Sequence, residues 1–358
     1  MPDHPPPSLY ADAPDILPVA LPPGAGVTAL IDLMGRTCFE ARHVAAAARL
    51  LVRMVDGGDT VWLGIAGAGI AGGLGGLVRQ LIERGMVHVI CSTGAQIYHD
   101  LHFAFGLPVK AISPHADDDL LRRHGDTRIH DIGIREVETL EAQDALVCRF
   151  IEERYAALRD RPLGSAAFNE QLGRWVRETA PHPERSFTVA AAEQGVPLFW
   201  DSHTNHSIAM NIARVEQAGK PLHFPVAADI AQSAAIVLGS PGTGFLELGG
   251  GGPKNFIQQT GPYLSQILGR AYEGAERGIQ IGTADRRDGG LSGCTFGEAV
   301  TWKKYRHAAE QDLVQVWAEY SLVLPLLAAY AFEHCAPREP PRLLDRLDAL
   351  TAALERAS

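Results

Sequence analysis

The sequence predicts an α/β fold, in which a mostly parallel sheet carries helices on both faces. Short apolar segments alternate with amphipathic helical segments along the chain, which is the pattern of repeated strand–helix units. The predicted strands are apolar at nearly every position, as expected where both faces of a parallel sheet are covered. Several of them run directly into glycine-rich turns, the usual link from a strand to a helix in such sheets. Together these observations predict a Rossmann-like, single large domain.

The first part of the chain provides two of these units. Residues 1–26 are rich in proline and predict a flexible N-terminal arm. A helix is expected over 42–56, where apolar residues recur at helical spacing, and a buried strand over 60–65. The next unit has a helix over 69–83 and a strand over 87–91.

The rest of the main domain, which we place at 27–335, continues this alternation. The stretch 110–135 is polar and predicts a loop, either an insertion or an oligomer contact. A charged amphipathic helix is expected in the C-terminal segment 336–358, over 342–356. The other predicted elements are helices over 187–194, 229–238 and 254–272 and strands over 196–200, 245–248 and 279–281.

The composition limits the classes of function. The 358 residues are 46% hydrophobic and 21% charged, with a formal net charge of −10. A negative net charge argues against nucleic acid and anionic membranes as partners. No apolar run reaches the about 18 residues of a membrane span, no signal peptide is visible, and the five scattered cysteines suit a reducing compartment. The sequence therefore predicts a soluble, cytoplasmic protein.

Two glycine-rich turns raise the expectation of a nucleotide. Residues 67–72 form a G-x-G-x-x-G motif between a strand and a helix, the arrangement that brings a pyrophosphate to a helix N-terminus. The acid that holds the ribose is missing, because the next strand ends in Ser92, Thr93 and Gly94. The first turn is therefore either part of a nucleotide site or a close helix–strand contact. The second turn can likewise bond to a nucleotide or be an ordinary turn.

A third turn has four consecutive glycines, 249–252, before Pro253 and Lys254. Glycine loses more conformational entropy on folding than any other residue, so a ligand or another backbone segment is expected very close to this run. The GK[ST] ending of a phosphate loop is absent, and a nucleoside triphosphatase is not expected.

Metal and hydrolase chemistry are not expected. His203 and His206 follow Asp201, but no third ligand and no HExxH pattern accompany them, so polar groups that line a pocket are the favoured interpretation. No G-x-S-x-G motif is present and Cys294 has no base beside it.

Glu298, Trp302 and Lys304 fall within seven positions and indicate chemistry on a cationic amine. The carboxylate can pair with an ammonium group, the indole face can hold an alkyl-ammonium chain, and the lysine can form a Schiff base. The same trio on an ordinary amphipathic helix has a structural role. Taken alone, it leaves both interpretations open.

Together these motifs resemble the deoxyhypusine synthase family. The order and spacing hold across roughly residues 60–330. The resemblance rests on Gly249-Gly250-Gly251 with Lys254, Asp288-Gly289-Gly290-Leu291-Ser292-Gly293, Glu298-Ala299-Val300-Thr301-Trp302-Lys303-Lys304 and Glu319-Tyr320-Ser321-Leu322-Val323-Leu324-Pro325-Leu326. It implies a deep NAD site and a homotetramer of tight dimers with active sites at the dimer interface.

The resemblance also implies roles by motif position. Lys304 corresponds to the catalytic lysine, which carries an aminobutyl group from spermidine to an acceptor amine as an imine in an NAD-dependent reaction. Lys304 must be neutral to attack, so its pKa is expected below the usual value of about 10.4. The implied substrate contacts are Asn255, Ser292, Glu298 and Trp302. The implied NAD contacts are Ser92, Thr93, Gly94, Asn205, Gly250, Gly251, Asp288 and Glu319.

The chain departs from the family at several positions that hold the amine. The family's synthases carry a histidine or an acid at or near the positions of Asn255, Leu291, Asn205, Met210 and His99. Each lost carboxylate–ammonium contact is worth about 1–3 kcal/mol. Spermidine is therefore not expected to be held as the synthases hold it.

Three functions remain open. The favoured one is an NAD-dependent transferase that moves an aminoalkyl group from a polyamine to a small amine or a protein lysine; a homospermidine-synthase-like reaction with putrescine is its small-molecule version. The second is an NAD-dependent amine oxidoreductase or lyase that stops at the imine. The third is a non-catalytic NAD-binding regulator, which the joint presence of Lys304, Glu298 and Trp302 disfavours.

Overall fold

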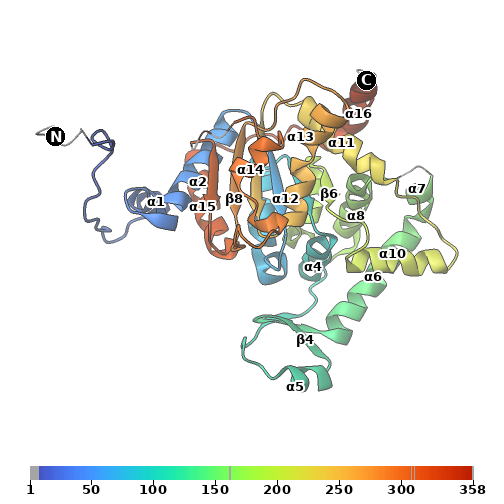
Figure 1. Ribbon diagram of the computed structural model, residues 1–358. Helices are drawn as coiled ribbons and strands as arrows, with labels where there is room; N and C mark the ends of the chain where they lie inside the picture. Colours follow the sequence, from blue (N-terminus) through green and yellow to red (C-terminus); the bar gives the residue numbers. More distant parts are fainter. Residues whose placement is uncertain (1–7, 161–162, 308, 310, 357–358) are drawn as a thin grey trace, which may run out of the picture.

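Six parallel strands form the central sheet, in the order β6-β2-β1-β7-β8-β9 (Figure 1). The computed structural model describes residues 8–160, 163–307, 309 and 311–356. The strands are β1 (Thr60–Ile65), β2 (Val89–Ser92), β6 (Leu198–Trp200), β7 (Thr243–Leu248), β8 (Arg277–Ile281) and β9 (Leu313–Val316). The first strand lies in the middle, the next two on one side of it and the last three on the other. Ligands of open parallel sheets bind beside such a switch point, at the carboxyl ends of the strands.

Helices connect the strands and cover both faces of the sheet. Up to β6 they are α1 (Val27–Gly35), α2 (Phe39–Asp56), α3 (Gly75–Glu83), α4 (Gly94–Ala104), α6 (Ala142–Glu153), α7 (Tyr155–Arg159), α8 (Ser165–Thr179) and α9 (Phe187–Gln194). The later ones are α10 (Ser207–Gln217), α11 (Val226–Leu238), α12 (Gly251–Gln258), α13 (Thr260–Pro262), α14 (Phe296–Thr301), α15 (Tyr320–His334) and α16 (Leu347–Arg356).

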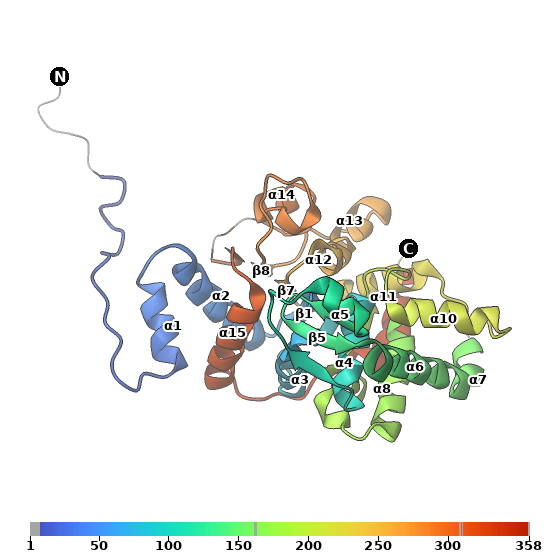
Figure 2. The same ribbon diagram turned by 90° about the horizontal axis from the view of Figure 1, so that it is seen from below.

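Alternate side chains of each strand enter two different cores, because successive residues of a strand point to opposite faces. On one face Leu63 and Leu246 pack with residues of α2, α3 and α15. On the other face Trp62 and Phe245 pack with residues of α11, α12 and α16. Figure 2 shows α12 and α14 on the side of the sheet opposite α3. The α/β fold with a parallel sheet covered on both faces is thus confirmed.

A small antiparallel sheet stands between α4 and α6, in the order β3 (Val109–Ala111), β5 (Ile132–Arg135) and β4 (Asp126–Ile129). It projects from the body together with α5 (Asp118–Arg123) (Figure 1). The stretch that the sequence predicts as a polar loop is therefore folded. Its strands have three or four residues and are mostly half-buried, so they carry little of the apolar alternation by which a strand is recognised.

Other differences from the predicted elements have local causes. The helix expected over 69–83 is interrupted, because Gly73 has φ of +93° within the π-helical turn (Ile70–Leu74) that precedes α3. The helix expected over 254–272 is α12, α13 and a π-helical turn that ends at Ile267. The edge strand β9 has only four residues and is not among the strands predicted from the sequence.

The two ends of the described chain differ. Residues 8–26 are exposed and lead away from the body (Figure 1), while residues 1–7 of the predicted arm lie outside the described residues. The predicted C-terminal helix is α16, preceded by a short turn at Leu343–Arg346, and its Leu347 and Leu354 are buried with residues of α11. Within the described residues, no helix has the length and apolar character needed to cross a membrane.

Candidate active site

The glycine runs after β1 and β7 meet at the switch point of the sheet. The backbone N–H of Ala66 donates to the carbonyl of Leu248 at 3.0 Å. Gly249 has φ of +80°, and a Cβ there would lie 2.6 Å from the carbonyl oxygen of Ala66. The close approach of another backbone, one of the two expectations for the four-glycine run, is thus observed at this residue.

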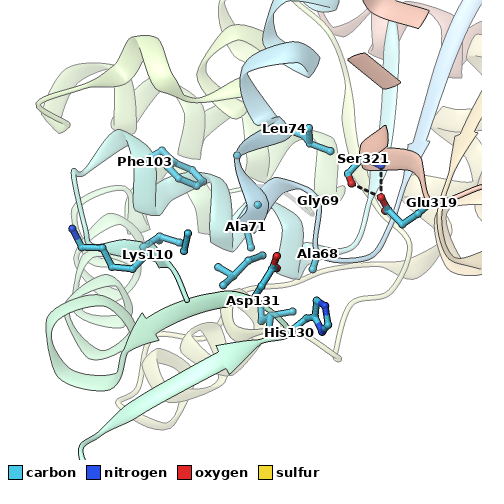
Figure 3. Close-up of a pocket in the computed structure, with 16 residues that line it drawn as sticks. Ala68, Gly69, Ala71, Leu74, Phe103, Lys110, His130, Asp131, Glu319 and Ser321 are labelled. Carbon is cyan, nitrogen blue, oxygen red and sulfur yellow. Dashed lines mark hydrogen bonds between the residues drawn. The ribbon is translucent and has the colours of Figure 1, made fainter. Parts of the chain in front are cut away.

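A first cavity of about 650 Å³ opens beside the turn that follows β1 (Figure 3). One wall is the glycine-rich turn, with Gly69, and the opposite wall is the small sheet, with Lys110 and Asp131. Glu319 and Ser321 line its end. The Glu319 carboxylate caps α15 by accepting a hydrogen bond from the backbone N–H of Ser321 at 2.8 Å.

The first amides of the glycine-rich turn already have partners within the protein. The N–H of Gly69 donates to the hydroxyl of Tyr320 at 2.7 Å, and the N–H of Ile70 donates to Gln96 Oε1 at 3.1 Å. A Cβ at Gly69 would lie 2.2 Å from the Tyr320 hydroxyl oxygen. The glycine at 69 is therefore required by the aromatic ring of α15, and its amide is not free for a pyrophosphate.

The turn after β2 is likewise occupied by contacts within the protein. Ser92 is fully buried, and its hydroxyl donates to the carbonyl of Ile65 at 3.3 Å. Thr93 caps α4, and the imidazole of His206 covers Gly94, where a Cβ would lie 2.3 Å from the ring. Asn205 is exposed. The NAD contacts expected of these residues remain predictions.

A second cavity, the α12 cavity, has a volume of about 620 Å³. Asp201, Asn255 and Trp302 line it, together with Tyr263 and Leu291. The Trp302 side chain is 64% exposed at its rim. The structure thus brings together two of the predicted substrate residues, Asn255 and Trp302.

The end of α14 decides which of two neighbouring lysines is buried. The N–H of Lys303 donates to the carbonyl of Val300 at 2.9 Å and the N–H of Lys304 to that of Ala299 at 3.0 Å, the two bonds of a Schellman motif. Lys303 takes the left-handed position of this motif, with φ of +56°, and is exposed. The reversal turns Lys304 inward, where it is 7% exposed. The buried environment favours Lys304 over Lys303 as the reactive amine.

Lys304 lies next to α12. Its Nζ donates to Asn255 Oδ1 at 3.1 Å. Burial lowers the pKa of Lys304, and the nearby positive charge of Lys254 lowers it further, while Cys294 and Glu247 act in the opposite direction. The lowered pKa agrees with the expectation for a nucleophilic lysine.

The buried Glu247, whose charge acts on Lys304, is part of a hydrogen-bond network. Its Oε1 accepts hydrogen bonds from Gln258 Nε2 at 2.7 Å and from the Tyr305 hydroxyl at 3.0 Å. Burial raises the pKa of Glu247, against the attraction of Lys254 and Lys304. This carboxylate was not singled out from the sequence, since within β7 it reads as one polar residue in an apolar run.

The loop before α14 is fixed to α12 by hydrogen bonds. Lys254 Nζ donates to Gln280 Oε1 at 2.9 Å and to the carbonyls of Leu291 at 3.1 Å and Cys294 at 2.8 Å. Ser292 Oγ accepts from the N–H of Gly251, the first residue of α12 after its N-cap Gly250, at 2.8 Å. The predicted substrate residue Ser292 therefore holds the helix N-terminus, and its contact with substrate stays a prediction.

Two predicted carboxylates lie in local turns. Glu298 forms a capping box with Thr295, whose backbone N–H and hydroxyl donate to Glu298 Oε2 at 2.7 and 2.8 Å. Asp288 Oδ1 accepts from the N–H of Gly290 at 2.7 Å and is exposed. The amine and NAD contacts predicted for these two residues remain untested.

The histidines considered as metal ligands have other partners. His203 Nε2 is 3.0 Å from Asp229 Oδ2, and His206 caps α10 by accepting from the N–H of Ala209 at 3.2 Å. No group of three side chains suited to a metal ion occurs in the part of the chain that the structure describes.

The fold and the site define a Rossmann-like α/β protein with a buried lysine of lowered pKa beside a cavity. The sequence profile of the deoxyhypusine synthase family matches residues 29–331. The chain belongs to this family.

Individual relatives agree with this assignment. The "Deoxyhypusine synthase-like protein" of Thermosynechococcus vestitus is 34% identical, over 97% of this chain and 88% of the relative. "Probable deoxyhypusine synthase 2" of Methanosarcina mazei is 36% identical, over 84% of this chain and 85% of the relative. A crystal structure attributed to the same family, from Entamoeba histolytica, has a TM-score of 0.58 at 18% identity and covers 88% of this chain and 96% of its own. At that identity the structural likeness shows the fold.

The first cavity fits the NAD that the family resemblance implies. Its volume is that of a cofactor site, and glycines along one wall let a ligand lie against the backbone. The Glu319 carboxylate suits ribose hydroxyls, and Lys110 lines the cavity from the small sheet, with its side chain extending away from the glycine-rich turn (Figure 3). The amides of Gly69 and Ile70 are excluded as pyrophosphate donors by their bonds to Tyr320 and Gln96.

Proposed function

We propose that the protein is an NAD-dependent transferase that moves an aminoalkyl group, of about aminobutyl size, from a polyamine to an acceptor amine through an imine at Lys304. The observation that carries the proposal is the environment of Lys304. Lys304 is 7% exposed as a residue, and its amine has a lowered pKa and makes one hydrogen bond among the described residues, to Asn255. A neutral amine held in this way is a nucleophile.

When bound, NAD would accept a hydride from the carbon beside a secondary amine of the donor, which brings that carbon to the imine level, and the NADH so formed would be available to reduce the final imine. The chain's own contribution is the nucleophile. Lys304 Nζ attacks that carbon, the bond from the carbon to the leaving amine breaks, and the leaving amine departs with the bonding electrons and a proton. The acceptor amine then attacks the same carbon and releases Lys304 as a neutral amine.

Asn255 orients this nucleophile. Because Oδ1 accepts one N–H of Lys304, the remaining positions on Nζ are directed away from the amide. An uncharged acceptor also leaves the lowered pKa in place, whereas a carboxylate there would raise it.

In this proposal NAD occupies the first cavity, which Glu319 lines, and extends beyond the residues that line it to reach Gly250, Gly251 and Asp288. The predicted contacts of Ser92, Thr93, Gly94 and Asn205 belong to the same proposal. They require side-chain movement at His206, since its ring covers Gly94.

We also propose that a second copy of the chain covers the rim of the α12 cavity, as part of the expected homotetramer. Apolar side chains at this rim are unusually exposed for their type, and they are Ile230 (43%), Leu291 (51%), Trp302 (64%) and Ile267 (67%). Trp302→Glu is expected to weaken assembly. Mass photometry of the two proteins tests this, and equal assembly would contradict it.

The experiment that tests the transferase is incubation of the protein with NAD and a panel of spermidine, putrescine and homospermidine, followed by mass spectrometry. Wild type is expected to form an aminoalkylated amine without net NADH, and Lys304→Ala is expected to form none. Product from Lys304→Ala would contradict the proposal. Steady accumulation of NADH without a transferred product would favour the oxidoreductase instead.

A further inference from the structure

Three buried or half-buried aspartates lie near the carboxyl edge of the sheet, and one of them differs from the others. Asp100 accepts hydrogen bonds from the N–H groups of Phe187 at 3.1 Å and Thr188 at 3.0 Å, as well as from a serine hydroxyl. Asp229 accepts from the N–H of Ser165 at 2.7 Å and contacts His203. These two carboxylates accept from groups of other segments, whereas Asp201 Oδ1 has no hydrogen-bond partner among the described residues, and the backbone amides that act on the Asp201 carboxylate are its own and that of Ser202.

Asp201 follows β6 directly and faces the α12 cavity. Its backbone N–H continues the sheet by donating to the carbonyl of Ser92 at 3.1 Å, which fixes the residue. Its Oδ1 is buried without a hydrogen-bond partner. Its Oδ2 lies against Gly252, where a Cβ would be only 2.1 Å away. The last glycine of the four-glycine run is therefore needed to admit this carboxylate.

The surroundings of Asp201 leave its charge uncompensated. Burial raises the pKa of Asp201 to about 6, and the nearby backbone amides of residues 201 and 202 only partly oppose this effect. The group is therefore mainly ionised at neutral pH. A partly desolvated carboxylate without a cation is a cost to the fold, and such groups concentrate where a ligand supplies the missing charge.

Two residues of α12 contact Asp201 and the reactive lysine, respectively. Gly252, which touches Asp201, and Asn255, which binds Lys304, are three residues apart and so lie on one face of the helix. Asp201 and Asn255 line the same cavity, with the aromatic side chains of Phe256, Tyr263 and Trp302. The cavity therefore offers an anion at one end, an apolar wall, and Lys304 beyond Asn255.

We propose that Asp201 receives a terminal ammonium group of the amine substrate and so determines its class, an aliphatic diamine or polyamine whose chain runs along α12 toward Lys304. The inference rests on the proposed function, to which it adds the residue that recognises the charge. Asp201 would also supply the negative charge for a cationic ligand in place of Glu298, whose carboxylate is engaged in a capping box.

The test is a thermodynamic cycle measured by calorimetric titration of the NAD-saturated protein. The probes are spermidine and its two mono-acetylated forms, each of which lacks one terminal charge. Wild type is compared with Asp201→Asn and with Asp345→Asn, a matched loss of charge at an exposed residue paired with Arg342. We expect spermidine to bind Asp201→Asn about 10- to 100-fold more weakly, and Asp345→Asn to bind as wild type does.

The acetylated probes identify the contact. For one of the two, acetylation is expected to weaken binding to wild type but to have little further effect on Asp201→Asn, because the same charge pair is removed twice. The melting temperature of free Asp201→Asn is expected not to fall, which separates this role from a structural one. Equal spermidine affinity in wild type and Asp201→Asn, or additive effects for both acetylated forms, overturns the inference. Transfer chemistry that is lost in Lys304→Ala but indifferent to Asp201→Asn would overturn the inference and leave the transferase standing.

Discussion

The start of α12 and the end of α14 each bury a lysine, and the two lysines have different surroundings. Lys254 is 4% exposed and donates three hydrogen bonds, to Gln280 and to the carbonyls of Leu291 and Cys294. Lys304 is 7% exposed and donates one among the described residues, to Asn255. Three acceptors match the three N–H groups of an ammonium ion, so the site of Lys254 is built for the charged form.

The same residue type therefore has two different roles in this fold, a structural role at Lys254 and a proposed catalytic role at Lys304. At Lys254 the charge is compensated, and the ammonium fixes the loop before α14 to the helix. At Lys304 burial dominates and lowers the pKa, so the neutral amine becomes available. The structural lysine also repels the other and thereby helps to lower its pKa.

The largest effect is expected from Lys304→Met. Transfer should fall by a factor on the order of 10³ or more, as when a nucleophile is removed, while the free energy of unfolding stays similar or rises because a desolvated amine is lost. Lys303→Met is the matched control, since that side chain is exposed. Product formation and urea unfolding, measured on both variants, test whether transfer is lost while stability is kept. Equal losses of transfer in the two variants would remove the distinction between the two lysines.

At Lys254 a substitution is expected to lower the stability of the fold. Lys254→Met leaves the acceptors on Gln280, Leu291 and Cys294 without their donor, which should cost about 3 kcal/mol or more of unfolding free energy. Urea unfolding of wild type and variant measures it. An unchanged midpoint and slope would show that the bonds of Lys254 do not hold the loop.

A change at Asn255 is expected to move the pH dependence. Asn255→Asp places a carboxylate beside Nζ, which favours the ammonium form and raises the pKa of Lys304 above that in the wild type. Since only the neutral amine attacks, the rise of activity with pH should shift to higher pH. A pH–rate profile of both proteins tests this, and a shift to lower pH would contradict the role given to Asn255.

The same lysine links stability to pH. In wild type, the native state binds fewer protons than the unfolded state between the lowered pKa of Lys304 and the ordinary value of 10.5, so its contribution to stability rises with pH through that window. In Asn255→Asp this rise should be smaller.

A smaller effect is expected on the stability of free Asp201→Asn. Because the pKa of Asp201 is raised to about 6, its ionisation destabilises the native state as the pH rises from about 4 to above 6. The variant should therefore be more stable than wild type at pH 7 by about 1 kcal/mol, after allowance for partial exposure. The difference should vanish below about pH 4. Urea unfolding at both pH values is the check, and a less stable variant at pH 7 would point to a structural carboxylate.

Much of the fold could be predicted from the sequence because its strands are continuous apolar runs between helices. The strand over 60–65 coincides with β1, for example. The edge strand β9 is too short for that pattern, with four residues, and the strands of the small sheet at 109–135 are both short and polar. Their strands depend on pairing with partners rather than on their own sequences.

The site could be predicted only where the chemistry is local. Lys304 is recognisable as a lysine within a motif, and its burial agrees with the role predicted for it. The structural reason for a glycine at position 69 could not be predicted, because the ring that packs against it belongs to Tyr320, about 250 residues away in the chain. Glu298 carries a local signal that was available, since Thr295 and Glu298 have the spacing of a capping box. Asp201 becomes informative only when the structure sets it against Gly252.

In the proposed reaction Lys304, and not the nearby buried Lys254, becomes bonded to the substrate carbon. Borohydride added during turnover with NAD and spermidine reduces an imine to a stable amine, and peptide mapping by mass spectrometry then locates the adduct. We expect an added aminobutyl mass on Lys304, with Lys254 and Lys303 unmodified. An adduct on Lys254, or turnover without any trapped lysine, would contradict it.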